Sequence, residues 1–153
     1  MTGWRRLSLP LASLLLGLSL TTAPDATAQT MVSVAGSTVN MRSGPGIRSE
    51  VLWTLGQGYP LKVVNRRGRW LQVEDFEQDR GWVARSLTGR TPHHIVQAPK
   101  ANIRRGPGLN HRVVGQAAYG ELLRTREKRQ DWVRVEREDG RTGWVARRLL
   151  WGW

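Results

Sequence analysis

One stretch of the sequence occurs twice, and this duplication constrains the fold more than any other feature. The segment Val39-Asn-Met-Arg-Ser-Gly-Pro-Gly46 returns as Ala101-Asn-Ile-Arg-Arg-Gly-Pro-Gly108, and Gly81-Trp-Val-Ala-Arg-Ser-Leu87 returns as Gly143-Trp-Val-Ala-Arg-Arg-Leu149. In both pairs the second copy begins 62 positions after the first, with no insertion or deletion between the motifs. A fixed offset across separate motifs indicates two copies of one folding unit.

The offset also sets the expected domain boundaries within the 153 residues. We expect one unit at 30–91 and a second at 92–153, joined by a short linker near 88–92. A linker this short that contains a proline restricts the relative orientation of the two units. A unit of about 60 residues can just bury a core of its own, which leaves little room for a catalytic cleft.

Residues 1–28 have the three parts of a secretory signal peptide. Arg5 and Arg6 form a basic start, an apolar run follows at 7–20, and Ala26-Thr-Ala28 is a small-residue cleavage site. The apolar run is shorter than the roughly 20 residues that span a bilayer. We therefore expect an exported protein, periplasmic or extracellular, with no transmembrane anchor after cleavage.

The composition limits the chemistry and indicates the partners. The chain has no cysteine, which excludes disulfides, thiolate nucleophiles and cysteine-bound zinc. His93 and His94 are adjacent and would face opposite sides of a strand, and His111 supplies no third ligand at a suitable spacing, so we expect no metal site and no cofactor. The 24 Lys and Arg outnumber the 12 Asp and Glu, and a net charge of +12 favours anionic polymers as partners.

Short segments rich in β-branched and aromatic residues predict an all-β fold. Glycine and proline clusters separate these segments, which lie at 31–34, 51–55, 61–64, 70–73 and 81–84 and recur in the second copy. No helical periodicity extends over 11 residues or more. Asp139-Gly140 predicts a two-residue hairpin turn, whereas Glu77-Gln78 at the same place in the first copy lacks the glycine and predicts a wider loop.

The repeated motifs resemble those of the bacterial SH3-like (SH3b) domain. The shared pattern is Asn-x-Arg-x-Gly-Pro-Gly, a later glycine at Gly58 or Gly120, Trp-x-x-Val, and Gly-Trp-Val ending in a leucine. The resemblance covers 30–153 and implies two SH3-like barrels in tandem. It also implies export and binding of peptidoglycan or its cross-bridge peptides, or a targeting role beside an amidase or peptidase.

We interpret the Gly-Pro-Gly segments as tight turns in a long loop, where proline fixes φ and glycine supplies unusual dihedral angles. The side chains of Asn40 and Asn102 are expected to satisfy backbone groups of that loop. Arg42 and Arg104 either hold the same loop or face a ligand, and the sequence leaves both interpretations open.

The tryptophans are the main candidates for ligand binding. Leu71 and Val73 share one face of a strand, so Trp70 points to the other face. The same alternation places Trp82 on the outer face of its strand, and it does the same for Trp132 and Trp144 in the second copy. Aromatic residues at similar positions line the peptide groove of eukaryotic SH3 domains, and flat rings suit sugars and extended peptides. The alternative is that these tryptophans wrap barrels too small to bury them, or pack one unit against the other.

Two further segments are candidates for contacts with a partner. The loop before Trp70 is basic and includes Arg67 and Arg69, which can recognise carboxylates or phosphates, although a solvated loop is the simpler interpretation. The tail at 149–153 contains two tryptophans, and it either closes the second barrel or docks on the first unit.

The sequence therefore predicts a non-catalytic, exported binding module that recognises cell-envelope polymer, either peptidoglycan glycan or stem peptide, through paired tryptophans. Two alternatives remain. In the first, the barrels bind an extended segment of an envelope protein and regulate that protein. In the second, the basic surface binds an anionic polymer. Export and the absence of a nucleic-acid-binding motif disfavour nucleic acid.

Overall fold

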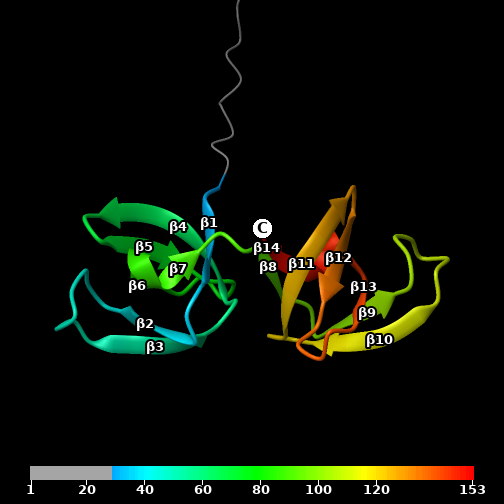
Figure 1. The fold of residues 1–153 in the computed structure, drawn as a ribbon, viewed down its shortest axis with the longest axis horizontal. Coiled ribbons are helices and arrows are strands. Elements are labelled where there is room, and N and C mark those ends of the chain that lie inside the picture. Colours follow the sequence, from blue (N-terminus) through cyan, green and yellow to red (C-terminus); the bar gives the residue numbers. More distant parts are fainter. Residues whose placement is uncertain (1–28) are drawn as a thin grey trace, which may run out of the picture.

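The computed structural model describes residues 29–153, which form two antiparallel sheets of seven strands each (Figure 1). The expected all-β fold of two SH3-like barrels is confirmed. The signal peptide expected at 1–28 lies outside the described residues. Within the described part of the chain, no helix is long and apolar enough to cross a membrane.

The two sheets have the same strand order. The first runs β3-β2-β6-β5-β4-β1-β7 and the second β10-β9-β13-β12-β11-β8-β14, so each strand has its counterpart in the other copy. The first sheet and its 3₁₀ turn comprise β1 (Met31–Val34), β2 (Thr38–Arg42), β3 (Val51–Gly56), β4 (Pro60–Arg67), β5 (Trp70–Glu74), β6 (Arg80–Ala84), η1 (Arg85–Leu87) and β7 (Thr88–Gly89). The second comprises β8 (His93–Val96), β9 (Lys100–Arg104), β10 (Val113–Ala118), β11 (Leu122–Arg129), β12 (Trp132–Glu136), β13 (Thr142–Ala146), η2 (Arg147–Leu149) and β14 (Leu150–Gly152).

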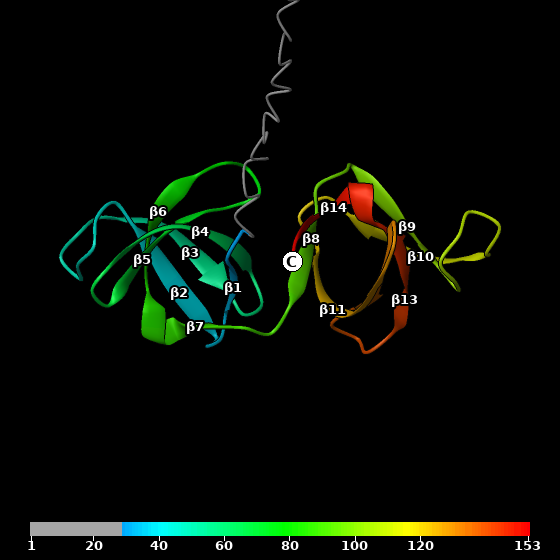
Figure 2. The ribbon, with the colours of Figure 1, turned by 90° about the horizontal axis from the view of Figure 1, so that it is seen from above.

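The two hydrophobic cores are built from equivalent sequence positions. Each sheet curls on itself (Figure 2) and encloses one set of buried side chains. The first set is Val34, Val39, Met41, Leu55, Leu61, Leu71, Val73 and Val83, and the second is Val96, Ala101, Ile103, Ala117, Leu123, Val133, Val135, Val145 and Leu150. Eight positions match at the 62-residue offset. Leu150 is additional, because its counterpart in the first copy is the polar Thr88.

The strand at Thr38–Arg42 was not expected, because the sequence placed it in a loop. Val39 and Met41 are buried on one face of this strand, which is the alternation of a half-buried strand. Asn40 therefore holds a neighbouring strand and not the loop backbone, since its Oδ1 accepts a hydrogen bond from Thr54 Oγ1 (3.0 Å). Asn102 Oδ1 accepts the equivalent bond from Gln116 Nε2 (3.0 Å).

The Gly-Pro-Gly segments form turns as expected, but for another reason. The backbone N–H of Gly46 donates to Gly44 O (2.9 Å), and Gly108 donates to Gly106 O (3.0 Å). Neither Gly44 nor Gly106 has a positive φ. A Cβ at Gly44 would instead lie 2.9 Å from Ser49 Oγ. A small residue is required here by crowding, so the expectation of unusual dihedral angles was wrong.

The β5–β6 and β12–β13 connections have the same turn, although only one of them has a glycine. Gly140 has φ +82° and donates to Arg137 O (2.9 Å), while Gln78 has φ +69° and donates to Asp75 O (3.1 Å). The wider loop expected in the first copy is therefore wrong. The converse substitution occurs at the preceding hairpins, where Gly68 has φ +57° and Gln130 has φ +50°.

Replacing Gln78 by glycine is expected to raise the free energy of unfolding by up to about 1 kcal/mol, because a left-handed backbone is costly for residues with a Cβ. The matched variant Gly140→Gln is expected to lower it by a similar amount. Urea unfolding of both variants tests this. A Gln78→Gly variant no more stable than the wild type would show that the turn carries no such strain.

The two domains contact each other directly. Trp153 Nε1 donates a hydrogen bond to Ser33 Oγ of β1 (3.1 Å), and β14 itself pairs with β8. The tail thus does both things that the sequence left open, since it closes the second sheet and docks on the first domain. At a separate contact, Tyr119 OH donates to Glu77 Oε1 (2.7 Å), and the Tyr119 and Phe76 rings lie 5.4 Å apart.

Candidate functional site

The candidate site lies on the outer face of β5 and β6. Leu71, Val73 and Val83 point into the core, so the alternate residues of both strands point outward. Trp70 lies opposite Ala84 and Trp82 lies opposite Gln72 in the antiparallel register. The two tryptophans are therefore diagonal neighbours on one face, a relation that places their Cβ atoms about 7 Å apart. Both side chains are half-buried.

The second domain repeats this register with a different exposure. Trp132 lies opposite Ala146 and is half-buried, as Trp70 is. Trp144 is only 7% exposed, which differs from the open ring that the sequence predicted. The Arg129 guanidinium lies 5.3 Å from the centroid of the Trp144 ring and covers it. This cation–π contact contributes to the burial of Trp144.

Arg67 and Arg69 end the β4–β5 hairpin beside Trp70. Arg67 is exposed and lies opposite Trp70 in the register, so the two side chains leave the sheet on the same face. Arg69 is also exposed, and its carbonyl accepts the backbone N–H of Arg85 (2.9 Å). Arg67 occupies the position that Arg129 has in the second domain. Of the two arginines, Arg67 is the one that is paired with a tryptophan in the sheet register.

Arg42 and Arg104 hold their own loops. Arg42 Nη1 donates to the carbonyls of Ile47 (3.0 Å) and Ser49 (2.9 Å). Arg104 Nη1 donates to the carbonyls of Leu109 (3.1 Å) and His111 (2.9 Å) in the same way. These bonds account for the repetition of the arginine without a ligand. They also leave part of each guanidinium free to donate elsewhere.

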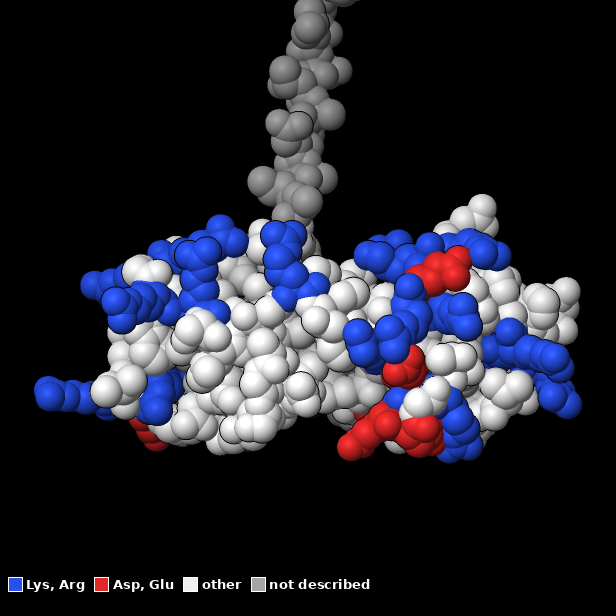
Figure 3. Space-filling model, in the orientation of Figure 1, with Lys and Arg blue, Asp and Glu red and all other residues white. Residues whose placement is uncertain are grey.

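Paired charges occupy the far end of the tryptophan face. Glu74 contacts Arg80 Nη2 (2.7 Å) and Lys62 Nζ (3.6 Å). The hydrogen bond from Arg80 lowers the pKa of the Glu74 carboxyl. Figure 3 shows more Lys and Arg than acidic side chains on the face it presents, and most of the acidic side chains visible there lie on the second domain. The tryptophan face of the first domain is thus bordered by cations at both ends.

Three carboxylates in the β5–β6 loop have oxygen atoms close enough to one another to hold a cation. These oxygens, on Asp75, Glu77 and Asp79, lie within 4.8 Å of one another. Asp75 Oδ1 already accepts the backbone N–H groups of Glu77 and Asp79 (both 2.9 Å). Burial raises the pKa of Asp75 and also that of Tyr59, whose hydroxyl lies 3.4 Å from Asp75 Oδ2. These hydrogen bonds account for the cluster as a support of the loop.

The sequence reasoning missed several exposed apolar side chains. Ile47 and Leu109, at matching loop tips, are 79% and 74% exposed, and Trp53 on β3 is 54% exposed. The signal for the loop tips was an apolar residue after each Gly-Pro-Gly. The signal for Trp53 was that this tryptophan is not repeated, since the equivalent position in the second copy is Gly115.

The fold agrees with what comparison with known proteins shows. The chain belongs to the bacterial SH3 domain family, whose model matches residues 35–89 and 97–152. Domains of this family are cell-wall-binding modules. YrvJ of Bacillus subtilis (strain 168), named as a candidate N-acetylmuramoyl-L-alanine amidase, is 25% identical over 130 residues. That match covers 78% of this chain but only 25% of YrvJ, so this chain spans about a quarter of its relative.

Two solved structures that the chain matches belong to longer chains. NlpC1 of Trichomonas vaginalis is 13% identical with a TM-score of 0.37, and the match covers 89% of this chain and 50% of that one. An NlpC/P60 family protein of Bacillus cereus ATCC 10987 has the same identity and TM-score, with 80% and 56% covered.

Proposed function

We propose that this protein is a non-catalytic, exported module that binds cell-envelope polymer, either peptidoglycan glycan or stem peptide. The observation that carries the proposal is the outward, diagonal pair Trp70 and Trp82 on a bacterial SH3 domain, with Arg67 on the same face. Half-buried rings held by a sheet offer rigid flat faces, which suit sugar rings and extended peptides.

The second domain contributes a smaller aromatic surface, centred on Trp132. Trp144 is covered by Arg129 and offers no open face. Two linked sites for one repetitive polymer raise its avidity, provided that both sites can engage together. The contacts of Trp153 and Tyr119 with the first domain support a fixed spacing between the two sites. The relative named as a candidate amidase supports peptidoglycan as the polymer.

The proposal predicts that Trp70→Ala combined with Trp132→Ala reduces co-sedimentation with purified peptidoglycan sacculi about tenfold or more, because each domain loses an outward-facing ring and avidity is lost as well. Single variants are expected to be intermediate. The matched control is Trp53→Ala, which removes a more exposed tryptophan from an edge strand and is expected to leave binding unchanged.

The dependence of sacculus binding on salt concentration distinguishes this proposal from binding of an anionic polymer. Binding through aromatic faces persists at high ionic strength, whereas binding of an anionic polymer by surface charge falls steeply. A protein partner would co-purify in fixed stoichiometry and leave bare sacculi unbound. Undiminished binding by the folded Trp70→Ala, Trp132→Ala variant would refute the tryptophan faces as the binding surface.

A further inference from the structure

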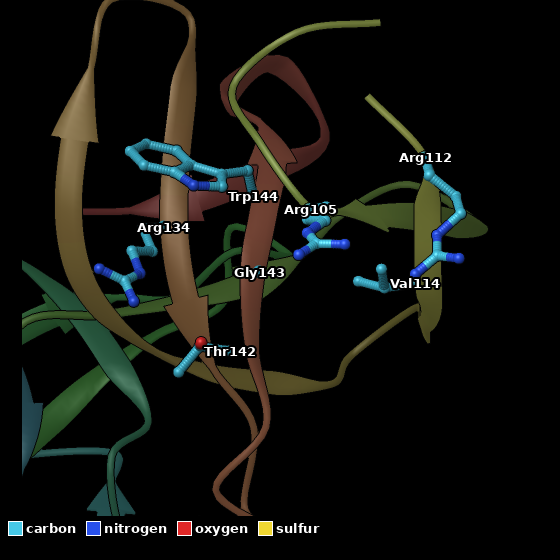
Figure 4. Close-up of a pocket in the computed structure, with 7 residues that line it drawn as sticks. All are labelled: Arg105, Arg112, Val114, Arg134, Thr142, Gly143 and Trp144. Carbon is cyan, nitrogen blue, oxygen red and sulfur yellow. The ribbon is translucent and has the colours of Figure 1, made fainter. Parts of the chain in front are cut away.

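A hollow of about 320 Å³ lies on the second domain and has a strongly basic lining (Figure 4). Gly143 of β13 forms its centre, with Trp144 and Val114 as apolar walls. The polar lining consists of the side chains of Arg105, Arg112, Arg134 and Thr142. The lining contains three cations and no carboxylate.

These three arginines have no ionic partner within residues 29–153. Arg105, Arg112 and Arg134 take part in no ion pair or side-chain hydrogen bond of that range. Other arginines of the same domain are neutralised, as Arg126 is by Glu136 and Arg137 is by Glu121 (2.8 Å). Three unpaired guanidinium groups around one hollow create a concentrated positive potential that attracts an anion.

The first domain lacks this arrangement, which argues against a role in folding. The matching positions are Ser43, Glu50 and Gln72, and Thr142 is replaced by Arg80, which is paired with Glu74. The two domains share a sheet order and eight core positions. A feature that the barrel required would occur in both copies. The arginines therefore distinguish the surface of the second domain and not its fold.

The distribution of the charges specifies the kind of anion. In the strand order β10-β9-β13-β12, Arg134 on β12 lies on one side of Gly143, and Arg105 and Arg112 lie on the other, as Figure 4 shows. A guanidinium can donate two parallel hydrogen bonds to one carboxylate. Cations on two sides match a ligand with two separated carboxylates better than a single point anion. The volume is at the lower end for small-ligand sites, which range upward from about 300 Å³.

We propose that this hollow binds a short peptide that carries two carboxylates, one held by Arg134 and the other by Arg105 and Arg112. The Thr142 hydroxyl donates to the ligand, and the aliphatic part of the ligand packs on Val114 and the edge of Trp144. The source of such a peptide rests on the proposed function, since the stem peptides of peptidoglycan carry free carboxylates. The site itself can be tested without the wall.

The test is isothermal titration calorimetry of the mature protein at low salt. The ligands compared are the dipeptide acetyl-Ala-Glu, which has two carboxylates, and its diamide, which has none. We expect one site per chain for the diacid and no binding of the diamide. Replacing Arg105, Arg112 and Arg134 together by glutamine should weaken the diacid about tenfold or more, because charge-assisted bonds are lost. The charge-matched control replaces Arg124, Arg147 and Arg148 by glutamine and should stay within about twofold, since long-range charge effects are screened.

Several results would contradict the proposal that this hollow binds a diacid. These are an absence of diacid binding, equal binding of diacid and diamide, or an equal loss in the charge-matched control. Tighter binding of inorganic phosphate than of the dipeptide would show that the hollow is built for phosphate instead. The outcome is independent of the sacculus assay, because failure of the dipeptide to bind leaves the tryptophan proposal intact, and failure of the tryptophan variants leaves this site intact.

Discussion

Replacing Gly143 by alanine is expected to destabilise the second domain by about 3 kcal/mol, because the added methyl group enters a filled core. A Cβ at this position would overlap Ile103 Cγ2 and lie 3.0 Å from the carbonyl oxygen of Arg104. Ile103 is only 3% exposed and β-branched, so its side chain has few alternative rotamers. The backbone of Arg104 is held in β9. Neither neighbour can move without disturbing the barrel.

The first domain provides a second version of this experiment. A Cβ at Gly81 would lie 2.5 Å from Met41 Cγ and 3.0 Å from Arg42 O. Methionine adapts more easily than isoleucine, so Gly81→Ala is expected to cost less than Gly143→Ala. Gly56→Ala is the matched control, since a Cβ there meets nothing within 4 Å. Urea unfolding measures all three variants, and equal stability of Gly143→Ala and Gly56→Ala would contradict the steric argument.

Acidification from pH 6.5 to pH 4 is expected to lower the free energy of unfolding by up to about 3 kcal/mol through His94 alone. The His94 side chain is 2% exposed, and its Nδ1 lies 2.6 Å from Thr125 Oγ1. Burial, reinforced by the positive charge of Lys128, lowers the pKa of His94 to about 4. The unfolded chain takes up this proton near pH 6.5 and the folded chain only near pH 4, so stability decreases as the pH falls between these values.

Urea unfolding at several pH values between 4 and 7 tests this effect. Burial also lowers the pKa of His93, which adds a contribution of the same sign. His94→Gln is expected to be less stable at pH 7 and to lose most of the dependence on pH, while the exposed His111→Gln should retain it. A pH dependence that is unchanged in His94→Gln would exclude this histidine as its source.

The sequence predicted the fold well because the signal was repeated. Duplication turned weak local patterns into strong ones, and alternation placed Leu71, Val73 and Val83 inside correctly. The strand Thr38–Arg42 was missed because its motif continues into the Gly-Pro-Gly turn, which concealed the alternation of Val39 and Met41. The turn at Gln78 was missed because the loop imposes a backbone conformation that the local residues do not prefer.

The candidate site was less predictable than the fold. Alternation gives the face on which a residue lies, but it does not show what lies above that residue. Trp144 is on the outer face and yet is covered by Arg129, and no strand pattern contains that contact. Likewise, Arg105, Arg112 and Arg134 are separate in sequence, and only the order β10-β9-β13-β12 brings them around one hollow.

The unequal packing of two otherwise matching cores has a consequence for how the chain folds. Neighbouring copies with interchangeable strands are prone to exchange them and become trapped in misassembled states. Here the first core has Leu55 and Leu71 where the second core has the smaller Ala117 and Val133. At another equivalent position the second core has Leu150 where the first copy has Thr88. A first-copy β3 or β5 inserted into the second barrel would overfill it, and the reverse exchange would leave cavities. At β14 the difference has the opposite sign, since β7 in its place would leave the volume of Leu150 unfilled. Side-chain volume thus sorts the strands, so that each copy completes its own barrel.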